Sequence, residues 1–278
     1  MYCKKPKLLL MAVVALTALA TAEPSYLWYR TYSVENYNGN GCDPEDSLNL
    51  PDCHNFAQGF VNAVEGHDLG AADVWLRGMV KDTDCVASNW TTTCSQANDC
   101  DFINYNGHGN HVYGPYFGAD EEYQFDIFSD VKFGGLDCWG GYLKWVQLMS
   151  CLSFYQAFPV DAWDDVFDGV HSVMGYRSDF YGIDGSEAYN TQCGEALSNE
   201  FWDNWVDGEM SINASWICAQ RDAAYYGYLD EQVGIEPGIV AALGMLYETW
   251  ASADDDPAGA GTGSFQYVTY GDPTYYGE

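Results

Sequence analysis

Short apolar stretches alternate with amphipathic ones along most of the chain, which predicts strands alternating with helices. Six stretches rich in β-branched and aromatic residues have the length and composition of strands. They lie at about residues 26–34, 74–80, 101–107, 143–149, 170–175 and 265–270. Each is short and ends near a Gly, Asn, Asp or Ser, as strands in a compact sheet do.

Apolar residues at helical spacing predict four helices between these strands. They lie at about residues 51–66, 161–168, 197–208 and 212–219. The apolar run 239–250 fits either a strand or a helix, whereas residues 178–194 and 251–264 predict loops. We therefore expect an α/β fold with a mostly parallel sheet that is covered on both faces.

The chain begins with the pattern of a secretory signal peptide. Three lysines among the first seven residues precede an apolar run over residues 8–20, and residues 20–22 (Ala-Thr-Ala) offer the small side chains that a signal peptidase requires. The run is too short to span a membrane. We expect residues 1–22 to be removed and residues 23–278 to form a single secreted, soluble domain.

Acidic residues dominate the charge of the chain. The 41 Asp and Glu residues outnumber ten Lys and Arg, which gives a formal net charge of −31. Loss of the three lysines of the signal peptide leaves seven basic against 41 acidic residues, a charge of −34. Such a surface repels nucleic acid and anionic membranes, so neither is an expected partner.

The cysteine count singles out Cys151. Ten cysteines less Cys3 of the signal peptide leave nine, an odd number. Exported proteins pair most of their cysteines, so we expect eight to form disulfides and one to remain a thiol. Cys151 is that candidate because it ends an apolar strand. Residues 82–100, with three cysteines and a glycosylation sequon at Asn89, predict a disulfide-pinned surface loop.

Two of the predicted strands end in side chains that together form a reactive pair. One ends at His108-Gly109 and the other at Ser150-Cys151, and the carboxyl ends of parallel strands share one edge of a sheet. An imidazole beside a thiol makes the thiolate available and can then protonate a leaving amine. The backbone N–H groups of Gly109 and Cys151 are candidate oxyanion donors.

This order of motifs resembles the caspase–legumain–gingipain clan of cysteine peptidases, gingipain-like members most closely. Further similarity lies in the strand at 170–175, in the helix that carries Trp216 and Ala219, and in the Gly-Asp-Pro of residues 271–273. The resemblance spans roughly residues 26–273 and rests on short motifs. It implies a caspase-like αβα three-layer sandwich with His108 as general base and acid and Cys151 as nucleophile.

The resemblance also implies where a substrate binds. The residue two before the nucleophile, Met149, corresponds to a position that often lines the S1 pocket, and an apolar side chain there does not fit a charged P1 residue. The loop after the next strand nominates Tyr176, Arg177 and Asp179. His171 is a further candidate for the cleft, although a satisfied strand histidine is the simpler explanation.

The resulting hypothesis is a secreted cysteine endopeptidase that acts on peptides or proteins and needs no cofactor. The alternative is a catalytically inactive, disulfide-stabilised caspase-like surface or binding protein. The spacing of His108 and His111 does not match a zincin, so no metal is expected at this site. Residues 254–256 (Asp-Asp-Asp) are more simply a solvated acidic loop than a calcium site.

Overall fold

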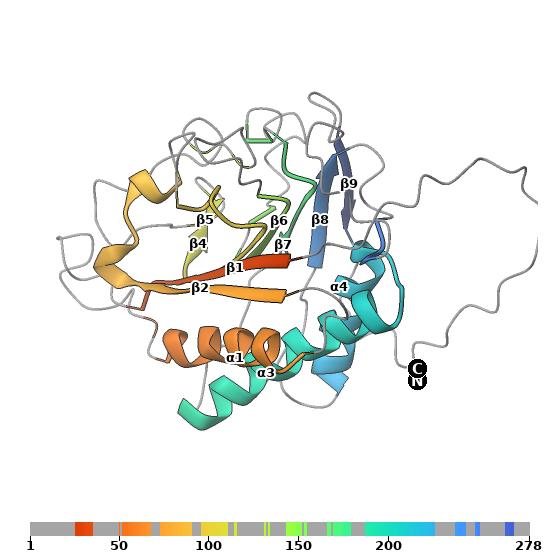
Figure 1. Ribbon diagram of the computed structural model, residues 1–278, viewed down its shortest axis with the longest axis horizontal. Coiled ribbons are helices and arrows are strands. Elements are labelled where there is room, and N and C mark those ends of the chain that lie inside the picture. The colour runs from red at the N-terminus through yellow and green to blue at the C-terminus, as the bar shows by residue number, and fades with distance from the viewer. Residues whose placement is uncertain are drawn as a thin grey trace, which may run out of the picture.

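In the computed structural model, a seven-stranded sheet forms the centre of the molecule (Figure 1). The residues that it describes are 26–35, 50, 52–67, 73–90, 96–110, 114–115, 131, 133, 143–151, 153–154, 166–167, 169–178, 187–225, 237–242, 248–250 and 265–269. The strand order is β2-β1-β3-β6-β7-β8-β9. Neighbours are parallel from β2 to β7, whereas β8 and β9 add in antiparallel pairs. The predicted α/β fold with a mostly parallel sheet is confirmed.

All six predicted strands are present. They are β1 (Tyr26–Ser33), β2 (Asp73–Lys81), β3 (Phe102–Asn106), β6 (Trp145–Met149), β7 (Ser172–Tyr176) and β9 (Phe265–Thr269). The ambiguous run after residue 239 begins as a strand, β8 (Pro237–Ala242), and a small hairpin pairs β4 (Gly109–Asn110) with β5 (Gly114–Pro115). Every residue of β3, β6 and β7 is buried, as expected for strands covered on both faces.

One face of the sheet packs against α1 (Cys53–Gly66), α3 (Glu187–Trp202) and α4 (Ile212–Tyr225). In Figure 1, α1 and α3 lie side by side beneath the strands. A five-residue π-helix, η6 (Asp203–Asp207), follows α3 directly. It ends at Gly208, as the sequence predicts. The aromatic side chains of this face are core, including the fully buried Trp145, Trp205 and Trp216.

The opposite face is covered differently in the part of the chain that the structure describes. Its apolar core joins the outward side chains of the strands to segments near residues 85–100, 131–133 and 166–170. The described residues near this layer form the 3₁₀ turns η2 (Asp82–Asp84) and η3 (Ala87–Asn89). Residues 85–90 and 96–100 contribute to a packed layer rather than a surface excursion, because Trp90 and Cys100 enter the core.

Two secondary-structure predictions are corrected. Helix α3 begins at Glu187, inside the loop predicted for residues 178–194. Gly194, which favoured a loop, allows α3 to approach the backbone of Phe56 in α1. In the predicted helix 161–168, Val166 lies in a turn and Phe167 makes a bridge to Phe133, while residues 161–165 and 168 lie outside the described residues.

Candidate active site

The two predicted reactive strand ends are neighbours in the sheet. β3 and β6 are parallel and adjacent, with Asn106 opposite Met149 in the register. The pairing continues one residue beyond β3, because the Gly107 N–H donates to the Met149 carbonyl oxygen at 3.3 Å. His108 and Cys151 each follow two residues after their strand. The topology therefore brings both to the carboxyl edge of the sheet.

Gly109 lies close to the backbone of Cys151 at the end of the other strand. A methyl group at its Cα would collide with the carbonyl oxygen of Cys151 and lie 3.2 Å from the Ser150 side chain. Only glycine leaves this space, so the His-Gly segment lies directly against the Ser-Cys segment. His108 and Cys151 are both partly exposed residues, and Cys151 also packs against the helix-side core.

A hydrogen-bonded turn holds Cys151. The Ser153 hydroxyl donates to the Ser150 carbonyl at 2.8 Å, and the two hydroxyl oxygens are 2.8 Å apart. The Phe154 N–H donates to the Tyr176 carbonyl at 2.8 Å, which ties the turn to β7. Sequence reasoning missed Ser153; its spacing of three from Ser150 is the signal that was available.

The predicted oxyanion donors, the N–H groups of Gly109 and Cys151, thus belong to two segments in contact. Both are backbone groups at the ends of rigid, buried strands, which is the kind of support that preorganised donors need. Of the two, Gly109 also starts β4, so the short hairpin with β5 helps to orient it.

Three predicted substrate-contacting side chains are fully buried. Met149 and Tyr176 belong to the core on the helix side, and the Tyr176 hydroxyl donates to the Met149 sulfur at 3.8 Å. Burial raises the pKa of Tyr176 well above its ordinary value. Neither side chain faces solvent in this structure. Met149 and Tyr176 are therefore not among the proposed substrate-binding residues.

His171 is also corrected as a cleft residue. It lies immediately before β7, at the opposite edge of the sheet from Cys151, and is fully buried. Its Nδ1 is 2.9 Å from Oε1 of the buried Glu248. The other prediction, a buried strand histidine, agrees with this contact at Nδ1; Nε2 has no hydrogen-bond partner among the described residues. Arg177, half-buried just beyond β7, does lie at the carboxyl edge, and Asp179 lies outside the described residues.

The prediction that eight cysteines pair is wrong for four of them. Cys53, Cys85, Cys100 and Cys193 are buried and form no disulfide, whereas Cys218 is disulfide-bonded. Hydrogen bonds take the place of a disulfide; for example, the Cys85 thiol donates to the Val80 carbonyl at 3.4 Å. Burial raises the pKa of Cys53 and of Cys100 from 9.0 to about 12, so both are protonated at neutral pH. They are unreactive as nucleophiles.

The sequon at Asn89 is buried and engaged. Asn89 is 4% exposed, its Oδ1 accepts from the Val86 N–H at 2.6 Å, and its Nδ2 donates to Gln96 Oε1 at 3.0 Å. A glycan needs this nitrogen at the surface, so Asn89 is not a glycan acceptor in the folded domain. The side chain caps the turn η3 instead.

A family model described as "Domain of unknown function (DUF6345)" matches residues 33–232. The chain belongs to this family. The matched part of this DUF6345 chain includes both His108 and Cys151. A search of curated proteins returned no match.

Among solved structures, the DUF6345 chain is similar to the X-ray structure of an inactive zymogen C11 protease from Parabacteroides distasonis. The TM-score is 0.39 and the sequence identity 9%, over 79% of this chain and 62% of that one. This chain thus matches less than two thirds of the other's length. A similarity at this level carries no conclusion about activity.

A second polar network of the DUF6345 domain has the composition of a hydrolase triad. His54 Nδ1 is 2.8 Å from Ser33 Oγ, and His54 Nε2 is 3.0 Å from Asp82 Oδ2. Ser33, however, is fully buried, and its hydroxyl donates to Cys53 Sγ at 3.5 Å. A buried hydroxyl cannot meet a substrate carbonyl, so this network anchors the start of α1 to the end of β1.

A row of buried amides supports the carboxyl edge from within the sheet. Asn106 donates to the side chain of Asn104, and Asn104 Nδ2 is 3.5 Å from Gln147 Oε1. These side chains belong to β3 and β6, the two strands that end at His108 and Cys151. Buried polar networks that are hydrogen-bonded fix one arrangement of neighbouring strands. The alternation in the sequence carried this signal, since Asn104 and Asn106 stand two positions apart in β3.

Several other sequence predictions lie outside the described residues. They are the signal peptide, His111 and the whole of the predicted loop 251–264 with its acidic residues 254–256. Within the helices that the structure describes, none has the length and apolar character of a membrane span.

Proposed function

We propose that this domain is a secreted cysteine endopeptidase in which Cys151 is the nucleophile and His108 the general base and acid. The observation that carries the proposal is the contact between Gly109 and Cys151 at the joined ends of β3 and β6. It is supported by the contrast between the partly exposed Cys151 thiol and the buried, protonated thiols elsewhere. The caspase-like arrangement of the motifs supports the same reaction class.

In the proposed reaction, His108 removes the proton of the Cys151 thiol and the thiolate attacks the carbonyl carbon of the scissile peptide bond. The resulting oxyanion accepts hydrogen bonds from the N–H groups of Gly109 and Cys151, and one such donor typically contributes about 3–4 kcal/mol. His108 then protonates the leaving amine. Water, deprotonated by His108, hydrolyses the thioester and regenerates the thiol.

The proposed substrate is a peptide or protein segment that reaches the carboxyl edge. Arg177 and Asp179 remain candidates for contacting it, because both follow β7 in the chain. The signal-peptide pattern of residues 1–22 supports a secreted location. No cofactor takes part in the proposed steps.

The test uses the full chain expressed with its own first 22 residues and recovered from outside the cell. Native protein is treated with iodoacetamide and mapped by mass spectrometry, and hydrolysis is followed on a peptide library. We expect Cys151 to be alkylated and Cys151→Ala to lose at least about 10³-fold in kcat/KM, as removal of a nucleophile requires. His108→Ala is expected to slow alkylation and hydrolysis together.

Cys100→Ala is the matched control, because it removes a thiol that is buried and protonated. It is expected to keep its activity. Hydrolysis that survives Cys151→Ala would exclude the mechanism. A native protein that alkylates at Cys151 but hydrolyses no member of the library would instead support the alternative, an inactive caspase-like binding protein; the burial of Met149 and Tyr176 is the observation that favours that alternative.

A further inference from the structure

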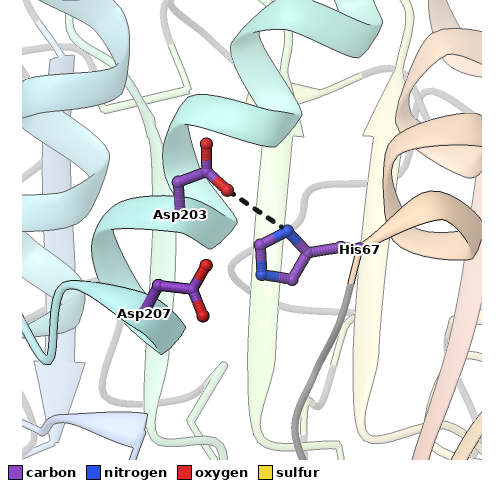
Figure 2. Close-up of side chains that lie close together, drawn as sticks. All are labelled: His67, Asp203 and Asp207. Carbon is purple, nitrogen blue, oxygen red and sulfur yellow. Dashed lines mark ion pairs between the residues drawn. The ribbon is translucent and has the colours of Figure 1, made fainter.

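A second cluster of ionisable side chains lies where α1 and α3 end. His67 follows the last residue of α1, and Asp203 and Asp207 are the first and last residues of η6. One ligand atom from each of the three side chains can be chosen such that all lie within 4.8 Å of one another. Figure 2 shows one ring nitrogen of His67 facing Asp203 and the other facing Asp207.

The histidine is buried and incompletely satisfied. Its side chain is only 5% exposed, and among the residues that the structure describes no group forms a hydrogen bond with Nε2. Nδ1 lies 3.4 Å from Asp203 Oδ1. A buried imidazole nitrogen without a partner is unfavourable, and a ligand that accepts its lone pair removes that penalty.

A short π-helical segment carries both carboxylates. In η6 the Gly208 N–H donates to the Asp203 carbonyl at 2.8 Å, the five-residue bond of a π-helix. Such short π segments interrupt α-helices and often occur at functional sites. Here the segment presents Asp203, 59% exposed, and the exposed Asp207 beside the buried His67.

We propose that His67, Asp203 and Asp207 bind a divalent transition-metal ion of the zinc class. One imidazole nitrogen and two carboxylate oxygens form a mixed N/O donor set, which suits zinc better than calcium or magnesium. Ligand atoms about 2.1 Å from a tetrahedral ion lie about 3.4 Å apart. The ion would bind His67 Nε2, the ring nitrogen that lacks a hydrogen bond and faces Asp207 (Figure 2), and the exposed carboxylates of Asp203 and Asp207 can rotate to bring their oxygens to that spacing.

The site lies at the opposite edge of the sheet from the candidate active site. Trp205 of η6 donates to the Glu248 carbonyl at 3.3 Å, and the Glu248 carboxylate accepts from Trp145, the first residue of β6, at 3.0 Å. The segment is therefore joined to the amino ends of the strands. The ion would link the ends of α1 and η6 and act as a structural clamp, independently of any reaction at Cys151.

The experiment uses the full chain, stripped of metal with a chelator and titrated with Zn²⁺ by calorimetry. We expect one ion per chain at this site and a higher Tm when it is bound, because a ligand of the folded state stabilises it. Asp203→Asn and Asp207→Asn are expected to weaken Zn²⁺ binding by about tenfold or more. Both side chains are exposed, so neither change threatens the fold.

Glu209→Gln is the matched control, since it removes an exposed acidic charge two residues beyond the site, and it should leave the affinity unchanged. Co²⁺ replaces Zn²⁺ as a spectroscopic probe, and nitrogen and oxygen ligation gives no thiolate charge-transfer band. Affinity that is unchanged in both Asp variants, a thiolate band, or tighter binding of Ca²⁺ or Mn²⁺ than of Zn²⁺ would overturn the proposal. Cys151→Ala should bind Zn²⁺ normally, which separates this site from the proposed catalytic one.

Discussion

Gly109 and Cys151 meet because Gly109 carries no side chain that would keep the two segments apart. The environment of each thiol then decides its chemistry. Cys151 is partly exposed at the sheet edge, whereas Cys53 and Cys100 are enclosed by core residues that raise their pKa to about 12. The same residue type therefore provides one candidate nucleophile and two apolar fillers, and burial rather than identity separates them.

Replacing Gly109 by alanine tests the contact directly. The added methyl group would collide with the Cys151 carbonyl, so either segment must shift. We expect Gly109→Ala to lower kcat/KM and the rate of Cys151 alkylation by about tenfold or more, because displacing catalytic groups by about 1 Å has effects of this size or larger. Rates are measured by initial velocity and mass spectrometry.

Gly66→Ala provides the comparison, since no atom lies within 4 Å of the position where its methyl group would be. That variant should react like the unmodified protein. Equal rates for Gly109→Ala would mean that the contact does not position the thiol.

At the level of elements, the pairing of α1 with α3 depends on two glycines that face each other. A methyl group on Gly59 would collide with the backbone of Thr191 and Glu195, and one on Gly194 would collide with the Phe56 carbonyl. The helices can approach this closely only where both lack side chains. This contact supports the start of α1, where His54 bonds to Ser33, and the far ends that carry His67 and Asp203.

Gly59→Ala is therefore expected to destabilise the protein through overpacking. Such substitutions typically cost about 1–3 kcal/mol, and backbone atoms on the opposite side leave little room for relaxation. Urea unfolding followed by circular dichroism measures the change in free energy. Gly66→Ala on the same helix should be neutral or slightly stabilising, because alanine favours helix and meets no neighbour there; a similar loss in both variants would refute the packing argument.

At the level of the whole molecule, buried thiols lie on both sides of the sheet. Cys53 is buried at the start of α1, and Cys100 belongs to the core of the opposite side. Burial disfavours the ionised form of both thiols in the folded state. The free energy of unfolding should therefore depend on alkaline pH through thiols on both sides of the sheet.

Stability should decrease as the pH rises above 9. The folded-state pKa of Cys53 and of Cys100 is about 12 against an ordinary value of 9.0, so the unfolded chain releases these protons first. The stabilisation is complete below pH 9 and is lost as the pH rises toward 12, with a slope approaching about 1.4 kcal/mol per pH unit for each thiol. Anaerobic urea titrations at pH 8, 9 and 10 measure it.

Cys100→Ala removes one of these buried thiols and is expected to give a shallower slope between pH 9 and 10. A slope that this substitution leaves unchanged would contradict the assignment. Cys151→Ala serves as the comparison, because Cys151 is only partly buried.

The sequence by itself determined most of the order of the elements and the position of two residues at strand ends. Period-two and helical patterns reflect local geometry, and a parallel sheet brings the carboxyl ends of its strands together whatever the loops do, so His108 and Cys151 could be placed at one edge of the sheet in advance. Disulfide pairing, the burial of Met149 and His171, and the engagement of Asn89 depend on contacts between distant segments that no local pattern encodes. The meeting of His67 with Asp203 and Asp207 is of this second kind. Only the packing of α1 against α3, through Gly59 and Gly194, brings the ends of those helices together and creates the site.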